Sequence, residues 1–199
     1  MFSFLNKQKK IHDQVSLAAA LHNITGQISN EELFTLYSYA LQLNDKAVIV
    51  EIGSYRGKSA IALGLAAKLS AARVYCIDPH EEFIGVAGGV FGPVDLKDKI
   101  SNIRKFDLGE VIFPVCLSSF DVGKIWSKPI DLLWIDGDHS YEGVSSDFYQ
   151  FSPYVKNNGK IIFHDNHMEG IKKLLNEINP NHFQKVNEVA SMIIYEKQL

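Results

Sequence analysis

Two groups of polar residues in this 199-residue sequence have the types and the spacing to do chemistry. The first group follows an apolar run and reads Glu51-Ile-Gly53-Ser54-Tyr55-Arg-Gly57-Lys-Ser59. The second group consists of Asp136-Gly-Asp138-His139 and, further along the chain, His164-Asp165-Asn166. Carboxylates and an amide can bind cations or accept hydrogen bonds from hydroxyls, an imidazole can accept a proton, and glycines let the backbone approach a ligand closely.

The apolar pattern around these residues predicts strands and helices in alternation. Strands are expected at 47–52, 72–78, 110–115, 130–136, 159–163 and, as a closing pair, at about 182–188 and 191–196. Helices are expected at 11–43, 58–70, 94–105, 118–125, 141–155 and 168–178. Only Val189 and Ala190 separate the closing strands, which must therefore be antiparallel.

This order predicts an α/β fold with a doubly wound, Rossmann-like sheet of seven strands, mostly parallel with an antiparallel C-terminal hairpin, and helices on both faces. Residues 1–199 are expected to form a single domain, with an N-terminal helical cap at 1–43 and the Rossmann-like core at 46–196. Ser29-Asn-Glu-Glu32 predicts a capping box in the helical cap. Residues 80–93 read as an irregular, glycine-containing stretch that could form a mobile lid.

Composition restricts the partners and the location of the protein. The 20 Lys and Arg residues and 23 Asp and Glu residues give a net charge of -3, so neither nucleic acid nor an anionic membrane is an expected partner. No apolar run approaches the roughly 18 residues of a membrane helix. Lys7, Lys9 and Lys10 follow a very short apolar stretch, the reverse of a secretory signal, and a cytoplasmic protein is expected. Cys76 and Cys116 lie in apolar runs and are expected to be buried, reduced thiols.

The loop after the first predicted strand allows three interpretations. A dinucleotide site would need G-x-G-x-x-G, which is absent. A P-loop-like nucleotide-binding site would need one more residue between Gly53 and Gly57, and Glu51 would repel a triphosphate. S-adenosylmethionine suits the loop best: Glu51 can face its amino group, loop N–H groups can take its carboxylate, and Asp78 can accept both ribose hydroxyls. Asp78 could instead cap a turn or helix.

The second group predicts a divalent cation site. Asp136 and Asp165 follow what should be neighbouring strands, about 4.7–4.9 Å apart, and with Asn166 they form an all-oxygen set suited to Mg²⁺, with Mn²⁺ or Ca²⁺ possible and zinc disfavoured. These types are also common in loops and caps. His139 is predicted to be the general base, although a solvated surface role is the alternative. His164 and His167 are interpreted as packing or hydrogen-bonding residues.

These residues together resemble the class I S-adenosylmethionine-dependent O-methyltransferases over about residues 46–166. The tract 51–60 looks like the first motif of the catechol and caffeoyl-coenzyme A O-methyltransferases. The tract 130–142, with His164-Asp165, resembles more closely the macrocin-type sugar O-methyltransferases, relatives of the cephalosporin hydroxylase-like proteins. Where the catechol-type enzymes have a Lys, this chain has His139, a departure that favours the sugar-modifying branch.

The resemblance implies roles for individual residues. The methionine end of the cofactor would be lined by Glu51, Gly53, Tyr55 and Ser59, and Ser54 and Asp136 also belong to the implied cofactor-binding residues. Asp78 would bind the ribose, and the turn at Ser118 and Ser119 would lie near the adenine. A divalent ion would bind Asp136, Asp165 and Asn166.

The expected activity is metal-assisted O-methylation of a small hydroxylated acceptor, such as a sugar or a catechol-like molecule. A cofactor-binding protein that no longer catalyses methyl transfer is the alternative from another class. The amphipathic N-terminal helices could also serve a homodimer.

Overall fold

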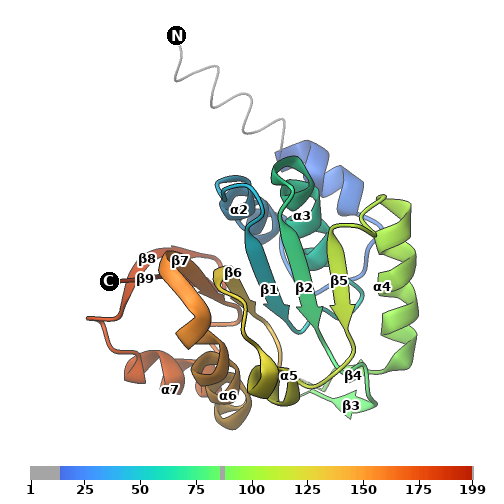
Figure 1. Cartoon of the computed structure of the whole chain (residues 1–199). Coiled ribbons are helices and arrows are strands. Elements are labelled where there is room, and N and C mark those ends of the chain that lie inside the picture. The colour runs from blue at the N-terminus through green and yellow to red at the C-terminus, as the bar shows by residue number, and fades with distance from the viewer. Residues whose placement is uncertain (1–13, 86–87, 199) are drawn as a thin grey trace.

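A seven-stranded sheet forms the centre of the molecule in the computed structural model, which describes residues 14–85 and 88–198 (Figure 1). The strand order is β5-β2-β1-β6-β7-β9-β8. The first five strands of this order are parallel, and β9 is antiparallel to both β7 and β8. The predicted fold is confirmed. The strands are β1 (Val48–Ile52), β2 (Arg73–Ile77), β5 (Ile112–Val115), β6 (Ile130–Ile135), β7 (Val155–Phe163), β8 (Phe183–Val189) and β9 (Met192–Lys197).

Helices cover both faces of the sheet and bury two apolar cores (Figure 1). One core lies under α2 (Asn30–Leu41), α3 (Lys58–Ala67) with the short η1 (Lys68–Ser70), and α4 (Pro93–Lys105). The other lies under α5 (Ser119–Ile125), α6 (Tyr141–Phe151) with η2 (Ser152–Tyr154), and α7 (Glu169–Glu177). The central strands are buried on both sides, which explains why they are mostly apolar rather than alternating, with Glu51 in β1 and Asp131 in β6 as the charged residues.

The N-terminal cap contains a helix at residues 14–21 followed by α2. The predicted capping box is present: the Ser29 hydroxyl accepts from the Glu32 N–H, and the Glu32 carboxylate accepts from the Ser29 N–H. The first part of the predicted 11–43 helical segment lies outside the described residues. Within 14–85 and 88–198, no helix is both long enough and apolar enough to cross a membrane.

Three local predictions are wrong. The stretch 80–93 contains a small antiparallel sheet, β3 (Phe83–Ile84) and β4 (Val90–Phe91). The helix predicted over 141–155 ends at Phe151, because Pro153 cannot continue it, and Val155 instead pairs with Ile130 at the start of β7. Cys76 is buried as predicted, but Cys116 is exposed, because β5 ends at Val115 and the chain then leaves the sheet.

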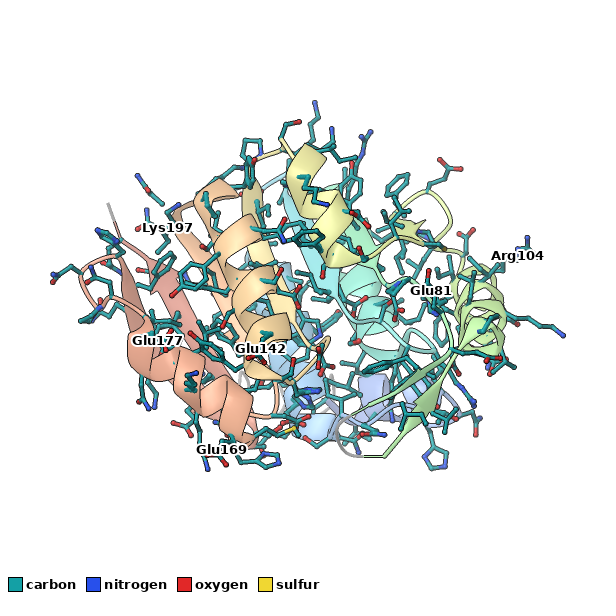
Figure 2. All side chains as sticks on the ribbon, turned by 90° about the horizontal axis from the view of Figure 1, so that it is seen from below. Glu81, Arg104, Glu142, Glu169, Glu177 and Lys197 are labelled. Carbon is teal, nitrogen blue, oxygen red and sulfur yellow. The ribbon has the colours of Figure 1, made fainter. Side chains whose placement is uncertain are left out.

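The strand order reverses at β1, which pairs with β2 on one side and with β6 on the other. Backbone hydrogen bonds continue just past the strand ends, from Gly53 to Ile77 and from Asp136 to Ile52. The loops that follow β1, β2, β6 and β7 therefore leave the same edge of the sheet next to one another. Figure 2 views the molecule from the side of this edge, with Glu81 on the inner side of α4 and Arg104 projecting outward from it.

Candidate active site

A cavity of about 500 Å³ opens at this edge of the sheet, where ligands bind in doubly wound folds. The structure brings nearly all of the predicted site residues to its wall. They are Gly53, Ser54, Tyr55, Ser59, Asp78, Ser118, Asp136, His139 and Asp165. Glu51 lies behind the wall, hydrogen-bonded to Ser59, and Asn166 is not part of the wall.

The loop after β1 depends on its first glycine. Gly53 has a φ of 79°, a conformation that side-chain-bearing residues rarely adopt. A Cβ at this position would overlap the carbonyl oxygen of Asp136 and lie 2.7 Å from the Cα of Gly137. The absence of a side chain at Gly53 thus allows the loops after β1 and β6 to pass in contact and to form one wall.

We therefore expect Gly53→Ala to destabilise the protein by about 3 kcal/mol or more, because both the positive φ and the backbone overlap oppose it. Urea unfolding followed by circular dichroism measures the change. Gly109→Ala is the matched control, since a Cβ there has nothing within 4 Å and stability should change little. Equal stability of the two variants would contradict this account of the loop contact.

Glu51 is a fully buried carboxylate at the base of this loop. Its Oε1 accepts a 2.6 Å hydrogen bond from the Ser59 hydroxyl, and its Oε2 is buried with no hydrogen-bond partner among the described residues. Burial raises the pKa of Glu51 to about 7, against the opposing effects of Cys76, Ser59 and Lys99. A buried carboxylate oxygen without a partner is costly, which indicates that a donor on a ligand would complete the site.

Asp78, at the end of β2, caps the loop after β1 and also lines the cavity. Its Oδ2 accepts from the backbone N–H groups of Ser54 and Tyr55, both at 2.9 Å, and its Oδ1 accepts from the N–H of His80 at 3.0 Å. The carboxylate thus caps the loop, which was the alternative considered from the sequence, and it also lines the cavity. Each carboxylate oxygen can accept more than one hydrogen bond, so hydroxyl groups of a ligand can still bind.

Two buried polar residues near the cavity were missed by the sequence analysis. Lys99 of α4 is fully buried, and its ammonium donates to the Ser54 hydroxyl at 2.7 Å. Asp147 of α6 is almost fully buried and accepts from the Ser119 hydroxyl, and burial raises its pKa to about 7. Asp147 occupies a position on the apolar stripe of α6, beside Val144, Phe148 and Phe151, and this signal could have identified it.

The turn before α5 places Ser118 and Ser119 on the cavity wall. The Ser118 hydroxyl caps the helix by accepting from the N–H of Asp121 at 3.1 Å. The Ser119 hydroxyl joins this turn to Asp147 on α6. The predicted position of Ser118 at the wall is therefore explained by local helix capping.

The polar residues after β6 and β7 form a cluster of two aspartates and two histidines. One ligand atom from each of Asp136, His139, His164 and Asp165 lies within 4.8 Å of the others. His139 Nε2 is 3.2 Å from Asp165 Oδ2 and 3.6 Å from Asp136 Oδ1. His164 Nδ1 is 3.1 Å from Asp136 Oδ1 and 3.3 Å from Asp165 Oδ2. Asp165 has a φ of 50°, an uncommon conformation of the kind found at functional sites.

The charges of this cluster are strongly coupled to one another. Burial alone would lower the pKa of His139, but the carboxylates of Asp136 and Asp165 beside its ring raise it to about 9. Burial likewise opposes the effect of the three carboxylates around His164, which raise the pKa of His164 to about 12. Burial would raise the pKa of Asp165, but the two histidines hold it well below its usual range. The carboxylates thus attract positive charge strongly.

The donor set of this cluster fits a divalent cation. It offers two carboxylates and two imidazoles, and the His139 Nε2 atom is buried with no hydrogen-bond partner among the described residues. Asn166 is placed differently: its side-chain N–H donates to Glu188 Oε1 at 3.0 Å, and its backbone N–H donates to Ser191. Participation of Asn166 in cation binding therefore stays a prediction. The side chain of His167 is 67% exposed.

The fold and the cavity define a Rossmann-like α/β protein with its polar site at the switch point of the sheet. A family model described as a methyltransferase domain matches residues 50–166, more than half of the chain, and the chain belongs to this family. The chain is also 32% identical over 128 residues to uncharacterized protein R132 of Acanthamoeba polyphaga mimivirus. That match covers 61% of this chain and 52% of the viral protein, so this chain spans about half the length of the curated relative.

Solved structures with the same fold share little sequence with this chain. The SAH-bound Podospora anserina methyltransferase PaMTH1 has a TM-score of 0.71 and 13% identity, covering 93% of this chain and 87% of its own. The O-methyltransferase NovP has a TM-score of 0.70 and 13% identity, and the match covers 86% of this chain and 81% of NovP. Ribosomal RNA methylases are among the proteins with this fold as well. At this identity the likeness establishes the fold alone.

Proposed function

We propose that this protein is an S-adenosylmethionine-dependent O-methyltransferase that modifies a small hydroxylated acceptor, such as a sugar or a catechol-like molecule. The observation that carries the proposal is that Asp78 and the cluster of Asp136, His139 and Asp165 line one cavity. That arrangement can hold a nucleoside cofactor beside a hydroxyl group. The membership in the methyltransferase family and the structural likeness to NovP support methyl transfer.

The cofactor would bind along the ends of β1, β2 and β5. The Oε2 atom of Glu51 would accept from the cofactor's ammonium group, and Asp78 would accept from the ribose hydroxyls. Gly53, Ser54, Tyr55 and Ser59 would surround the methionine end, and Ser118 would lie near the adenine. S-adenosylmethionine supplies the methyl group. The SAH-bound state of PaMTH1, which has the same fold, supports this choice of cofactor.

The acceptor would bind beside the cluster of aspartates and histidines. A divalent cation held by Asp136 and Asp165, with Asn166 as the remaining ligand expected from the sequence, would act as a Lewis acid and lower the pKa of the acceptor hydroxyl. His139 would hold the acceptor oxygen in line with the methyl group and take up its proton at Nε2. The walls of the cavity would keep the two reacting groups in contact, which can supply about 7–11 kcal/mol of the barrier.

The direct test is product formation. Purified full-length protein is incubated with S-adenosylmethionine, a divalent metal salt and a panel of sugars and catechols, and methylated product and S-adenosylhomocysteine are measured by mass spectrometry. Stoichiometric formation of both products supports the proposal. Tight binding of S-adenosylhomocysteine without any methylated product across the panel would favour the non-catalytic alternative.

Cofactor affinity should depend on pH through Glu51. Burial raises the pKa of Glu51 to about 7 in the protein without cofactor. Below this pH the carboxyl group must therefore lose a proton before it can pair with the ammonium group of the cofactor. We expect the affinity for S-adenosylhomocysteine to rise about tenfold per pH unit below pH 7 and to level off above about pH 8. Calorimetric titrations between pH 5.5 and 8.5 measure this slope.

The Glu51→Gln variant keeps an acceptor for Ser59 but removes the titrating group, so its slope should be flat and its affinity at pH 8 weaker. The exposed Glu110→Gln variant is the matched control and should behave as the wild type. A Glu51→Gln variant that retains the full pH slope would show that another group titrates.

A further inference from the structure

His164 lies between carboxylates on two opposite sides of its ring. The residue is 3% exposed and follows the last residue of β7. On one side, its Nδ1 is 3.1 Å from Asp136 Oδ1 and 3.3 Å from Asp165 Oδ2. On the other side, its Nε2 is 3.4 Å from Glu32 Oε1. The sequence alone predicts a packing or hydrogen-bonding role for His164.

The Nδ1 side has the geometry of a ligand. One N–H can donate well to a single acceptor, yet Nδ1 faces one oxygen from each of two aspartates at nearly equal distances. The ligand atoms of Asp136, His164, Asp165 and His139 lie within 4.8 Å of one another. Ligands about 2.1 Å from one ion are separated by up to roughly 4.2 Å, so small side-chain rotations would close the set around a cation.

On the Nε2 side, the Glu32 carboxylate lies at ion-pair distance, with Oε1 3.4 Å from Nε2, and Nε2 itself has no hydrogen-bond partner among the described residues. Glu32 Oε1 also accepts from the backbone N–H of Ser191 at 2.9 Å and from its hydroxyl at 2.6 Å. Glu32 Oε2 accepts from the N–H of Ser29 in the capping box. Glu32 is thus fixed by the start of α2 and by the turn between β8 and β9. Metal-binding histidines commonly have such a carboxylate behind the nitrogen that does not bind the metal.

We propose that His164 Nδ1 binds the divalent cation together with Asp136 and Asp165, with Glu32 as the outer carboxylate. The inference rests on the proposed function in placing a cation at the two aspartates. It replaces the all-oxygen ligand set with a mixed nitrogen and oxygen set. Imidazole favours first-row transition metals, so the site should prefer Mn²⁺, Fe²⁺, Co²⁺ or Zn²⁺ to Mg²⁺.

The first experiment detects the nitrogen ligand directly. Full-length protein is loaded with Mn²⁺ as the probe, and pulsed electron paramagnetic resonance records the modulation from nitrogen nuclei coupled to the ion. We expect a ¹⁴N modulation that is replaced by a ¹⁵N pattern when the protein is made with ¹⁵N-labelled histidine. This labelling needs no variant and therefore does not depend on whether a variant folds. Absence of any histidine nitrogen coupling would overturn the inference.

Three variants assign the coupled histidine. The modulation should be lost in His164→Gln and kept in His139→Gln and in the matched control His167→Ala, whose side chain is mostly exposed. Thermal unfolding of each variant checks the fold. Modulation that persists in His164→Gln but vanishes in His139→Gln would assign the nitrogen to the other histidine and overturn the inference.

Affinities provide a second measurement that needs neither cofactor nor acceptor. Calorimetry should show Mn²⁺ binding at least about tenfold more tightly than Mg²⁺, and His164→Gln should remove that preference. Glu32→Gln should weaken Mn²⁺ binding by about 10–100-fold, whereas the exposed Glu31→Gln should not. If Asn166→Ala, rather than His164→Gln, weakened Mn²⁺ binding, the all-oxygen set would be correct.

The two proposals fail separately. A protein with a histidine-bound Mn²⁺ that forms no methylated product would contradict the proposed function and leave the ligand assignment intact. A protein that methylates an acceptor without histidine nitrogen coupling would contradict the ligand assignment and leave the proposed function intact.

Discussion

Replacing Asp136 with Ala is expected to reduce methyl transfer by about 10³-fold or more while leaving S-adenosylhomocysteine binding measurable. Asp136 follows β6, and its Oδ1 is the oxygen that approaches both His164 Nδ1 and His139 Nε2. Removing this carboxylate would take away a cation ligand and a partner of the proposed base. Charge stabilisation by a bound cation is worth several kcal/mol in the transition state, and about 4 kcal/mol corresponds to a factor of 10³.

The measurement is a single-turnover assay with saturating enzyme, which follows formation of S-adenosylhomocysteine independently of product release. Calorimetry with S-adenosylhomocysteine is done on the same preparation, because retained binding separates a catalytic defect from a folding defect. The exposed Asp45→Asn variant is the control and should turn over as the wild type does. Wild-type turnover in Asp136→Ala, or in wild-type protein with excess chelator, would remove the cation from the mechanism.

The positions of Asp78, Asp136 and Asp165 could be predicted because each follows an apolar run that had to be a central strand. Parallel strands buried on both faces have a strong sequence pattern, and their carboxyl ends meet at one edge. The residue type and the position after a strand were therefore enough to predict that these three carboxylates lie at one edge of the sheet. β1, β2, β6 and β7 confirm that reasoning, since they are adjacent and parallel in the sheet.

The role of His164 could not be predicted in the same way. Its outer partner Glu32 is 132 positions earlier in the chain, where the sequence predicts only a capping box. The capping geometry is correct, but capping uses Oε2, whereas Oε1 serves the turn at Ser191 and faces His164. A contact between distant elements leaves no local pattern, so only the folded chain shows it.

Lys99 shows a different limit of pattern reasoning. A lysine within an otherwise amphipathic helix is ordinarily interpreted as a solvated side chain, because its charge is costly to bury. Here the ammonium is fully buried and donates to Ser54, and Gly57 leaves room for its methylene chain, since a Cβ there would lie 3.0 Å from Lys99 Cγ. The loop after β1 therefore has a charged support from α4 in addition to the Asp78 cap.

The second large effect is expected for His139→Ala, which should lower kcat by about 10²–10⁴ if His139 takes up the acceptor proton. His139 follows Asp136 on the cavity wall, and its Nε2 is buried beside both aspartates. In the ligand-free site these carboxylates raise the pKa of His139 to about 9, which would keep it protonated at neutral pH. A dication shared by the same carboxylates offsets that charge, so the base and the cation should be needed together.

This dependence gives His139→Ala a signature that a structural role would not produce. Added imidazole should restore part of the lost turnover in His139→Ala, because a free base can enter the cavity left by the side chain, and it should not restore turnover in Asp136→Ala. The dependence of kcat on pH between 6 and 9 should flatten in His139→Ala, while the KM for the cofactor stays within a few-fold of the wild type. His167→Ala, with its exposed ring on the neighbouring loop, should leave both profiles unchanged. An His139→Ala variant with the wild-type pH profile and no response to imidazole would mean that solvent or another group accepts the proton.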